Sequence, residues 1–129
     1  MQDFRQLQVW QKAHALTLSI YRATADFPTE EKYGLVSQMR RSASSIRTNL
    51  AEGCGREGQR ELARYTEIAR GSASELEYQL LLARDLGFMT DLIYHQLNAV
   101  LTEVQKMLVS FRQSITSPTH NSRLRTQNS

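Results

Sequence analysis

The sequence predicts an all-α protein that folds as an antiparallel, up-down-up-down four-helix bundle. Apolar residues recur at steps of three and four along most of the 129-residue chain, which is the spacing of helices with one buried face. No segment sustains the alternation of apolar and polar residues that marks a half-buried strand. The segments between the apolar stripes are short, and short connections place sequential helices antiparallel.

The first two helices are expected at about 6–26 and 30–52. Phe27-Pro28 ends the first, because proline cannot continue a helix. Glu30 and Glu31 stand where a helix N-terminus favours acids, and Gly53 stands where a C-cap is expected. The stripe of the first helix is Val9, Ala13, Leu16, Ile20 and Ala23, and that of the second is Leu35, Met39, Ala43, Ile46 and Leu50.

The third and fourth helices are expected at about 59–86 and 91–115. The third carries a heptad seam that stops before Gly87, and Thr90 with Asp91 supplies the start of the fourth. The fourth stripe is Ile93, Leu97, Val100, Val104, Met107, Phe111 and Ile115. Residues 116–129 are rich in Ser, Thr, Asn and Gln, so a flexible tail is expected after a single domain at 1–115.

Composition indicates one ordinary globular domain, with 40% hydrophobic and 22% charged residues. Cys54 is the only cysteine, which is consistent with a reducing compartment. No apolar run approaches the roughly 18 residues of a membrane span. We therefore expect a cytoplasmic protein with no membrane partner.

The third helix is more apolar than one bundle requires. Leu80, Leu81 and Leu82, with Leu76 and Leu86, spread around most of its circumference, whereas a surface helix normally keeps a polar face. This pattern predicts a homo-oligomer in which outer faces are buried between subunits. The alternative is that these are scattered surface leucines, which are common.

No catalytic, cofactor or metal site is predicted. The segment 53–58 matches G-x-G-x-x-G, but that dinucleotide motif requires a preceding strand, and here a helix precedes it. His14, His95 and His120 occur singly, without the Glu-x-x-His pairs of a metal-binding bundle. We therefore expect a protein that is not an enzyme.

The basic residues indicate a candidate nucleic-acid surface. Sixteen Lys and Arg against thirteen Asp and Glu give a net charge of +3, and thirteen of the sixteen are Arg, which can grip phosphates with two bonds. The alternative is that these Arg are solvated and paired with Glu52, Glu57 and Glu61. The candidates are Arg40, Arg41, Arg47, Arg56, Arg60 and Arg64.

A polar cluster is predicted between the second and third helices. Folding back through the turn near Arg56 brings Arg41 opposite the Ser72 to Glu75 region. Arg41 and Gln38 are therefore expected to bond to Glu75. The expected role of this network is to fix the register of the two helices.

Several blocks in order resemble the bacterial four-helix-bundle proteins related to those encoded in 23S rRNA intervening sequences. Relatives of that family include the accessory variability determinant of diversity-generating retroelements. The family often has a proline where this chain has Arg47. The blocks are Val9-Trp10-Gln11-Lys12-Ala13, Tyr33-Gly34-Leu35, Gln38-Met39-Arg40-Arg41-Ser42-Ala43, Asn49-Leu50-Ala51-Glu52-Gly53 and Ala69-Arg70-Gly71-Ser72-Ala73-Ser74-Glu75.

The resemblance implies a bundle that assembles into a ring, expected to be a pentamer, with no known catalytic activity. It also implies nucleic acid, and a protein partner such as a reverse transcriptase, as ligands of a basic surface. The leading hypothesis is thus an oligomeric accessory protein that binds RNA or DNA through Arg-rich surfaces. The alternative is a protein–protein scaffold with no nucleic-acid role.

Overall fold

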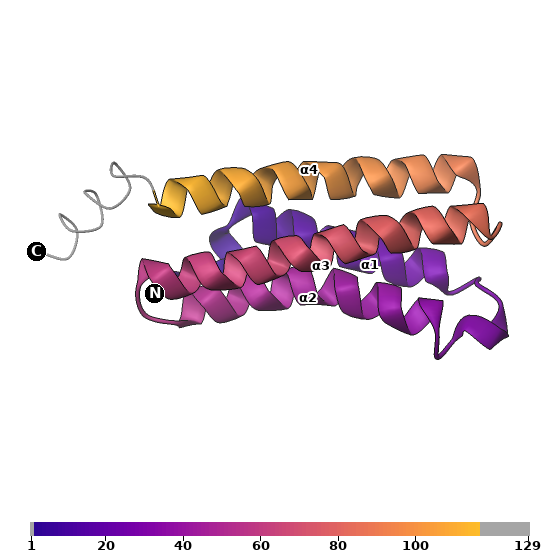
Figure 1. The fold of residues 1–129 in the computed structure, drawn as a ribbon, viewed down its shortest axis with the longest axis horizontal. Coiled ribbons are helices and arrows are strands. Elements are labelled where there is room, and N and C mark those ends of the chain that lie inside the picture. Colours follow the sequence, from indigo (N-terminus) through magenta and orange to yellow (C-terminus); the bar gives the residue numbers. More distant parts are fainter. Residues whose placement is uncertain (1, 117–129) are drawn as a thin grey trace, which may run out of the picture.

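The computed structural model describes residues 2–116, which form four long helices. Each helix contacts its two neighbours around the bundle, α1 with α2 and α4, and α3 with α2 and α4. The helices alternate in direction, so the chain runs up, down, up and down, as Figure 1 shows. The described residues contain no strand, and the all-α prediction is confirmed. The helices are α1 (Gln8–Thr24), α2 (Leu35–Gly55), α3 (Gln59–Asp85) and α4 (Asp91–Thr116), with 3-10 turns η1 (Phe4–Gln6) and η2 (Thr29–Glu31).

The core is built from the apolar stripes on the helices. The five stripe residues predicted for α2 are at most 5% exposed, so the predicted buried face of this helix is confirmed. On α4 the predicted stripe is buried in part, at Leu97, Val104 and Ile115, and the buried face also includes residues that were not predicted. Leu101 and Leu108 are fully buried, whereas Ile93, at the first turn, is 39% exposed.

The boundaries of α2 differ from those predicted. Residues 29–31 form η2, and α2 begins only at Leu35, where the Glu31 carboxylate accepts a hydrogen bond from the Leu35 N–H (3.3 Å). At its other end α2 continues through Gly53 to Gly55. Gly53 is therefore not a C-cap. Its missing side chain serves packing, because a Cβ there would lie 3.0 Å from the Cβ of Tyr65 in α3.

The connection between α3 and α4 is a capped turn. Gly87 has a φ of 78°, and its N–H donates to Arg84 O while the next N–H, of Phe88, donates to Ala83 O (both 2.9 Å). This pair of bonds is the Schellman motif, which ends α3. Thr90 Oγ1 then accepts from the Ile93 N–H (3.2 Å), which confirms Thr90 as the residue that opens α4.

The polar contact between α2 and α3 uses smaller side chains than predicted. Ser72 Oγ of α3 donates to Ser45 Oγ of α2 (2.8 Å), and within α2 Asn49 Nδ2 donates to Ser45 O (2.8 Å). Within residues 2–116, no hydrogen bond or ion pair joins Gln38 or Arg41 to Glu75, and all three are exposed. Short hydroxyl and amide groups fit the seam between close helices, whereas the long charged side chains stay in solvent.

Thr116 is the last residue of α4, and the predicted tail beyond it lies outside the described residues. Among residues 2–116, no helix combines the length and apolar character needed to cross a bilayer.

Candidate nucleic-acid interface

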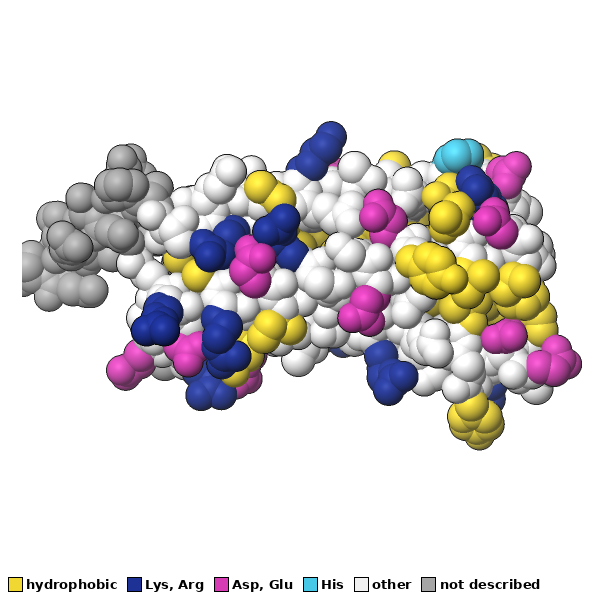
Figure 2. All heavy atoms as spheres, in the orientation of Figure 1, with side chains coloured by type: hydrophobic (Ala, Val, Ile, Leu, Met, Phe, Trp, Pro, Cys, Tyr) yellow, Lys and Arg dark blue, Asp and Glu magenta, His cyan; other side chains and the backbone are white. Residues whose placement is uncertain are grey.

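Charge and apolar surface are separated along the length of the bundle. Figure 2 shows most dark-blue basic side chains of this face near the end where α3 begins and α4 finishes. A yellow apolar area covers the opposite end, where α3 passes into α4. The six predicted Arg residues do not all lie at the basic end of the bundle.

Two of the six predicted Arg residues lie in the contact between α1 and α2. Arg40 Nε donates to Thr24 Oγ1 (3.0 Å), Nη2 donates to Tyr21 O (3.2 Å), and the guanidinium covers the Tyr21 ring at 4.6 Å. The Arg47 carbonyl accepts from Trp10 Nε1 (3.1 Å), and its side chain is half-buried. Both residues hold α2 against α1. Arg41 is exposed elsewhere on α2.

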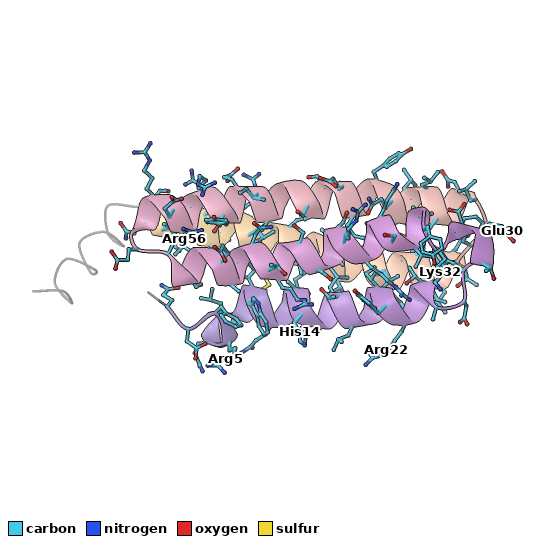
Figure 3. The ribbon with its side chains drawn as sticks, turned by 90° about the horizontal axis from the view of Figure 1, so that it is seen from below. Arg5, His14, Arg22, Glu30, Lys32 and Arg56 are labelled. Carbon is cyan, nitrogen blue, oxygen red and sulfur yellow. The ribbon has the colours of Figure 1, made fainter. Side chains whose placement is uncertain are left out.

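The other three, Arg56, Arg60 and Arg64, gather at the turn between α2 and α3. Figure 3 shows Arg56 at this end of the bundle, with Glu30 and Lys32 at the far end. Arg40 and Arg56 are separated by 16 positions, which is about 24 Å along a helix. The six residues therefore do not form one surface.

A groove brings Arg60 and Arg64 together with Arg112, from the last turns of α4. We call it the Arg groove. Its volume is about 520 Å³, and none of its described lining residues is acidic. Ala63 and Ile115 supply an apolar base, and both are buried. The lining residues are Gln59, Arg60, Ala63, Arg64, Arg112, Ile115 and Thr116.

Acidic side chains beside the Arg groove neutralise part of its charge. Arg64 Nε donates to Glu61 Oε2 (2.7 Å), a hydrogen bond that lowers the pKa of Glu61 and raises that of Arg64. Arg56, which is not one of the residues that line the groove, donates from Nη2 to Glu52 Oε1 (2.8 Å). Within residues 2–116, Arg60 forms no direct ion pair, although its charge is one of those that lower the pKa of the neighbouring Glu61. Exposed ion pairs of this kind contribute little to stability.

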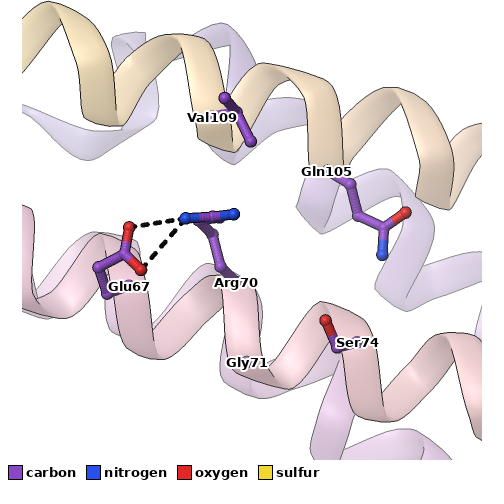
Figure 4. A pocket seen from close by; sticks show the side chains of 6 residues that line it. All are labelled: Glu67, Arg70, Gly71, Ser74, Gln105 and Val109. Carbon is purple, nitrogen blue, oxygen red and sulfur yellow. Dashed lines mark hydrogen bonds and ion pairs between the residues drawn. The ribbon is translucent and has the colours of Figure 1, made fainter.

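A second groove lies farther along α3 and α4, shown in Figure 4. Its volume is about 350 Å³, and Arg70 within it donates to both carboxylate oxygens of Glu67 (3.0 and 3.2 Å). Arg112 Nε lies 3.2 Å from the same carboxylate. One carboxylate thus lies close to two guanidinium groups, so these three side chains carry one positive charge in excess.

Sequence reasoning missed Arg112, although the topology places it. Arg64 lies 21 residues before the end of α3, and Arg112 lies 21 residues after the start of α4. Antiparallel helices joined by a short turn bring such positions to the same height. Counting charge across the predicted bundle, rather than only between positions 40 and 64, finds this residue.

The other residues considered in the sequence are Cys54, the histidines and the glycine-rich segment 53–58, and His120 lies outside the described residues. Cys54 is 2% exposed, and burial raises the pKa of its thiol, so the reactive thiolate is disfavoured. Across residues 2–116 there is no group of three or more His, Cys, Asp or Glu placed to hold a metal ion. The segment 53–58 follows a helix, not the strand that a dinucleotide site requires.

The fold and the groove define an all-α bundle protein with an Arg-lined surface at one end. The family model described as 23S rRNA-intervening sequence protein matches residues 5–110, and the chain belongs to this family. The resemblance seen in the sequence blocks is thereby confirmed.

Comparison with solved structures agrees with this family. A crystal structure from Bacteroides thetaiotaomicron, of a protein with unknown function from the S23 ribosomal protein family, is similar to this chain. The two share 25% sequence identity with a TM-score of 0.73, and the match covers 84% of this chain and 99% of that one. A comparison with curated proteins finds no match.

Proposed function

We propose that this protein is a non-enzymatic accessory protein that binds RNA or DNA through the Arg groove. The observation that carries the proposal is a groove lined by three Arg side chains from two helices with no acidic residue in its described lining. The name of the family, which refers to an intervening sequence of 23S rRNA, supports RNA as the first ligand to test.

The groove suits the phosphate backbone more than base edges. Guanidinium groups bind phosphates with two parallel hydrogen bonds, and each phosphate that is neutralised releases counterions. Arg60 and Arg64 are one helical turn apart, about 6 Å along α3, so they can contact neighbouring phosphates. Contacts of this kind carry no direct sequence information. The expected binding is therefore weakly selective for sequence and steeply dependent on salt.

Self-association is the second part of the proposal. Large apolar side chains are exposed at the end opposite the Arg groove, including Tyr78 (63%), Leu86 (52%) and Leu92 (67%). Exposed apolar patches on a small protein indicate an interaction surface. We propose that this apolar end joins subunits into a ring, with the five subunits that the family resemblance implies.

The two parts of the proposal support each other. Arg60 and Leu86 lie near opposite ends of α3, about 40 Å apart. Assembly through the apolar end therefore leaves every Arg groove open. Several weak phosphate contacts presented by one ring add through multivalency.

The experiment compares two double variants by fluorescence anisotropy with labelled RNA and DNA over a salt series. Arg60→Gln with Arg112→Gln removes two groove charges, while Arg22→Gln with Lys32→Gln removes two exposed charges elsewhere. The groove variant is expected to bind at least tenfold more weakly at low salt. The slope of the logarithm of its binding constant against the logarithm of the salt concentration should be smaller in magnitude by about two for each subunit that binds. Equal effects of the two variants, or no binding by the wild type at the lowest salt, would reject the proposal.

The scaffold alternative has its own support. Arg56 and Arg64 are paired with Glu52 and Glu61, and Arg40 is used between helices. A protein that assembles normally but never binds nucleic acid would fit this alternative. Measuring mass in solution for each variant separates the two functions.

A further inference from the structure

Tyr65 follows the groove residue Arg64 in α3, and two guanidinium groups lie near its ring. The Arg64 guanidinium carbon lies 4.5 Å from the centre of the Tyr65 ring, and that of Arg56 lies 5.6 Å from it. Arg64 also lines the groove, so one side chain belongs to both features. Gly53 makes this arrangement possible, because without a Cβ it lets the end of α2 approach Tyr65 closely.

We infer that Tyr65, Arg56 and Arg64 form a stacking platform for an unpaired base, so that the surface prefers single-stranded to double-stranded nucleic acid. This inference rests on the proposed function and specifies its ligand. Aromatic rings and guanidinium planes both stack on bases, and every base has a face that can stack. The backbone of the same strand would lie in the groove, where Arg64 links base and phosphate contacts.

Charge alone predicts the opposite preference. Double-stranded DNA carries a higher density of negative charge than a single strand, so a surface that reads only phosphate binds the duplex at least as well. The bases of a duplex are paired and stacked, and a platform on the protein surface cannot reach their faces. A preference for the single strand therefore reports stacking.

Two glutamates form ion pairs with the Arg side chains of the platform, so a nucleic acid must compete with these carboxylates when it binds. Glu52 and Glu61 hold Arg56 and Arg64 in the unbound protein, at 2.8 and 2.7 Å. Both pairs are half exposed, so phosphate competes with the carboxylates for the guanidinium groups. Tyr65 itself is half-buried, so part of this residue already lies at the protein surface.

The test measures the affinity of the full chain for one labelled oligonucleotide, alone and annealed to its complement. Tyr65→Leu removes the ring, Tyr65→Phe keeps it, and Tyr21→Leu is the matched control because Tyr21 is also stacked by an Arg but lies between α1 and α2. We expect Tyr65→Leu to weaken single-strand binding about tenfold and duplex binding less than twofold, with Tyr65→Phe close to wild type.

The outcomes separate this inference from the proposed function. The inferred stacking platform is rejected if the wild type binds the duplex as tightly as the single strand or more tightly. It is also rejected if Tyr65→Leu loses affinity for both ligands equally, and in both cases the proposed binding of phosphate by the groove still stands. Absence of binding to either ligand overturns both. A normal unfolding transition and solution mass of Tyr65→Leu show that the loss does not come from misfolding.

Discussion

At the scale of single residues, two glycines within helices differ in how closely their surroundings pack. Gly53 is buried against α3, and a Cβ there would lie 3.0 Å from Tyr65 Cβ and 3.1 Å from Leu62 Cδ1. Gly71 lies inside α3, and apart from the adjacent backbone of its own helix nothing lies within 4 Å of the position of a Cβ. Only the first glycine is required by packing, and it is the one that brings the end of α2 to the stacking platform.

Substitution by alanine should therefore change the free energy of unfolding in opposite directions at Gly53 and Gly71. Gly71→Ala is expected to stabilise the protein by about 0.5–1 kcal/mol, because alanine loses less backbone entropy in a helix. Gly53→Ala gains the same helical preference but overpacks the contact, and we expect a net loss of about 1 kcal/mol. Urea unfolding at a fixed protein concentration, followed by circular dichroism, measures both.

A result of the opposite sign for either variant would contradict the packing described here. Stabilisation by Gly53→Ala would mean that α2 and α3 can move apart at this end without a cost in the free energy of unfolding. Destabilisation by Gly71→Ala would mean that another subunit covers the second groove in solution.

At the scale of helices, α4 depends on a side-chain cap that the other three lack at their N-cap residue. Leu7, Gly34 and Gly58 precede α1, α2 and α3 without a capping side-chain bond, whereas Thr90 Oγ1 accepts from the Ile93 N–H. A serine, threonine or aspartate cap typically stabilises a helix by about 1 kcal/mol.

Thr90→Ala is accordingly expected to lower the free energy of unfolding by about 1 kcal/mol, and Thr90→Ser to preserve it. The same urea titration measures this, with hydrogen exchange of the first turn of α4 as a local readout. Protection of that turn should fall in Thr90→Ala and remain in Thr90→Ser. Unchanged protection in both variants would show that the Schellman turn at Gly87 alone fixes the start of α4.

The helices could be predicted because their stripes are long, and the exceptions are local. The stripe on α2 was predicted throughout, since five buried positions in succession fix a helical phase. The start of α2 was misplaced because Glu30 and Glu31 fit the acidic first turn of any helix, including a 3-10 turn. Gly53 was misread because a glycine near a helix end suggests a cap, while its packing against α3 is a tertiary property.

At the scale of the whole molecule, the candidate site was only partly predictable. Arg56, Arg60 and Arg64 follow one turn of the chain, so sequence distance was a fair guide to them. Arg112 is close to them only because α3 and α4 are antiparallel. Arg40 and Arg47 have the right charge, but they lie on the part of α2 that contacts α1, which charge counting does not reveal.

The apolar end gives the strongest prediction about the assembled molecule. Leu86→Glu with Leu92→Glu places charges on exposed side chains, so the helices should still form, but a subunit interface there could not bury them. We expect light scattering to show a smaller solution mass, with Val109→Glu, another exposed apolar position on α4, as the control that leaves the mass unchanged. Dissociated subunits keep an intact Arg groove, yet their apparent affinity for a long RNA should fall by a factor on the order of a hundred, because the contacts no longer act together. A variant that dissociates but binds as tightly as the wild type would show that each bundle acts alone, and that assembly serves a purpose other than binding nucleic acid.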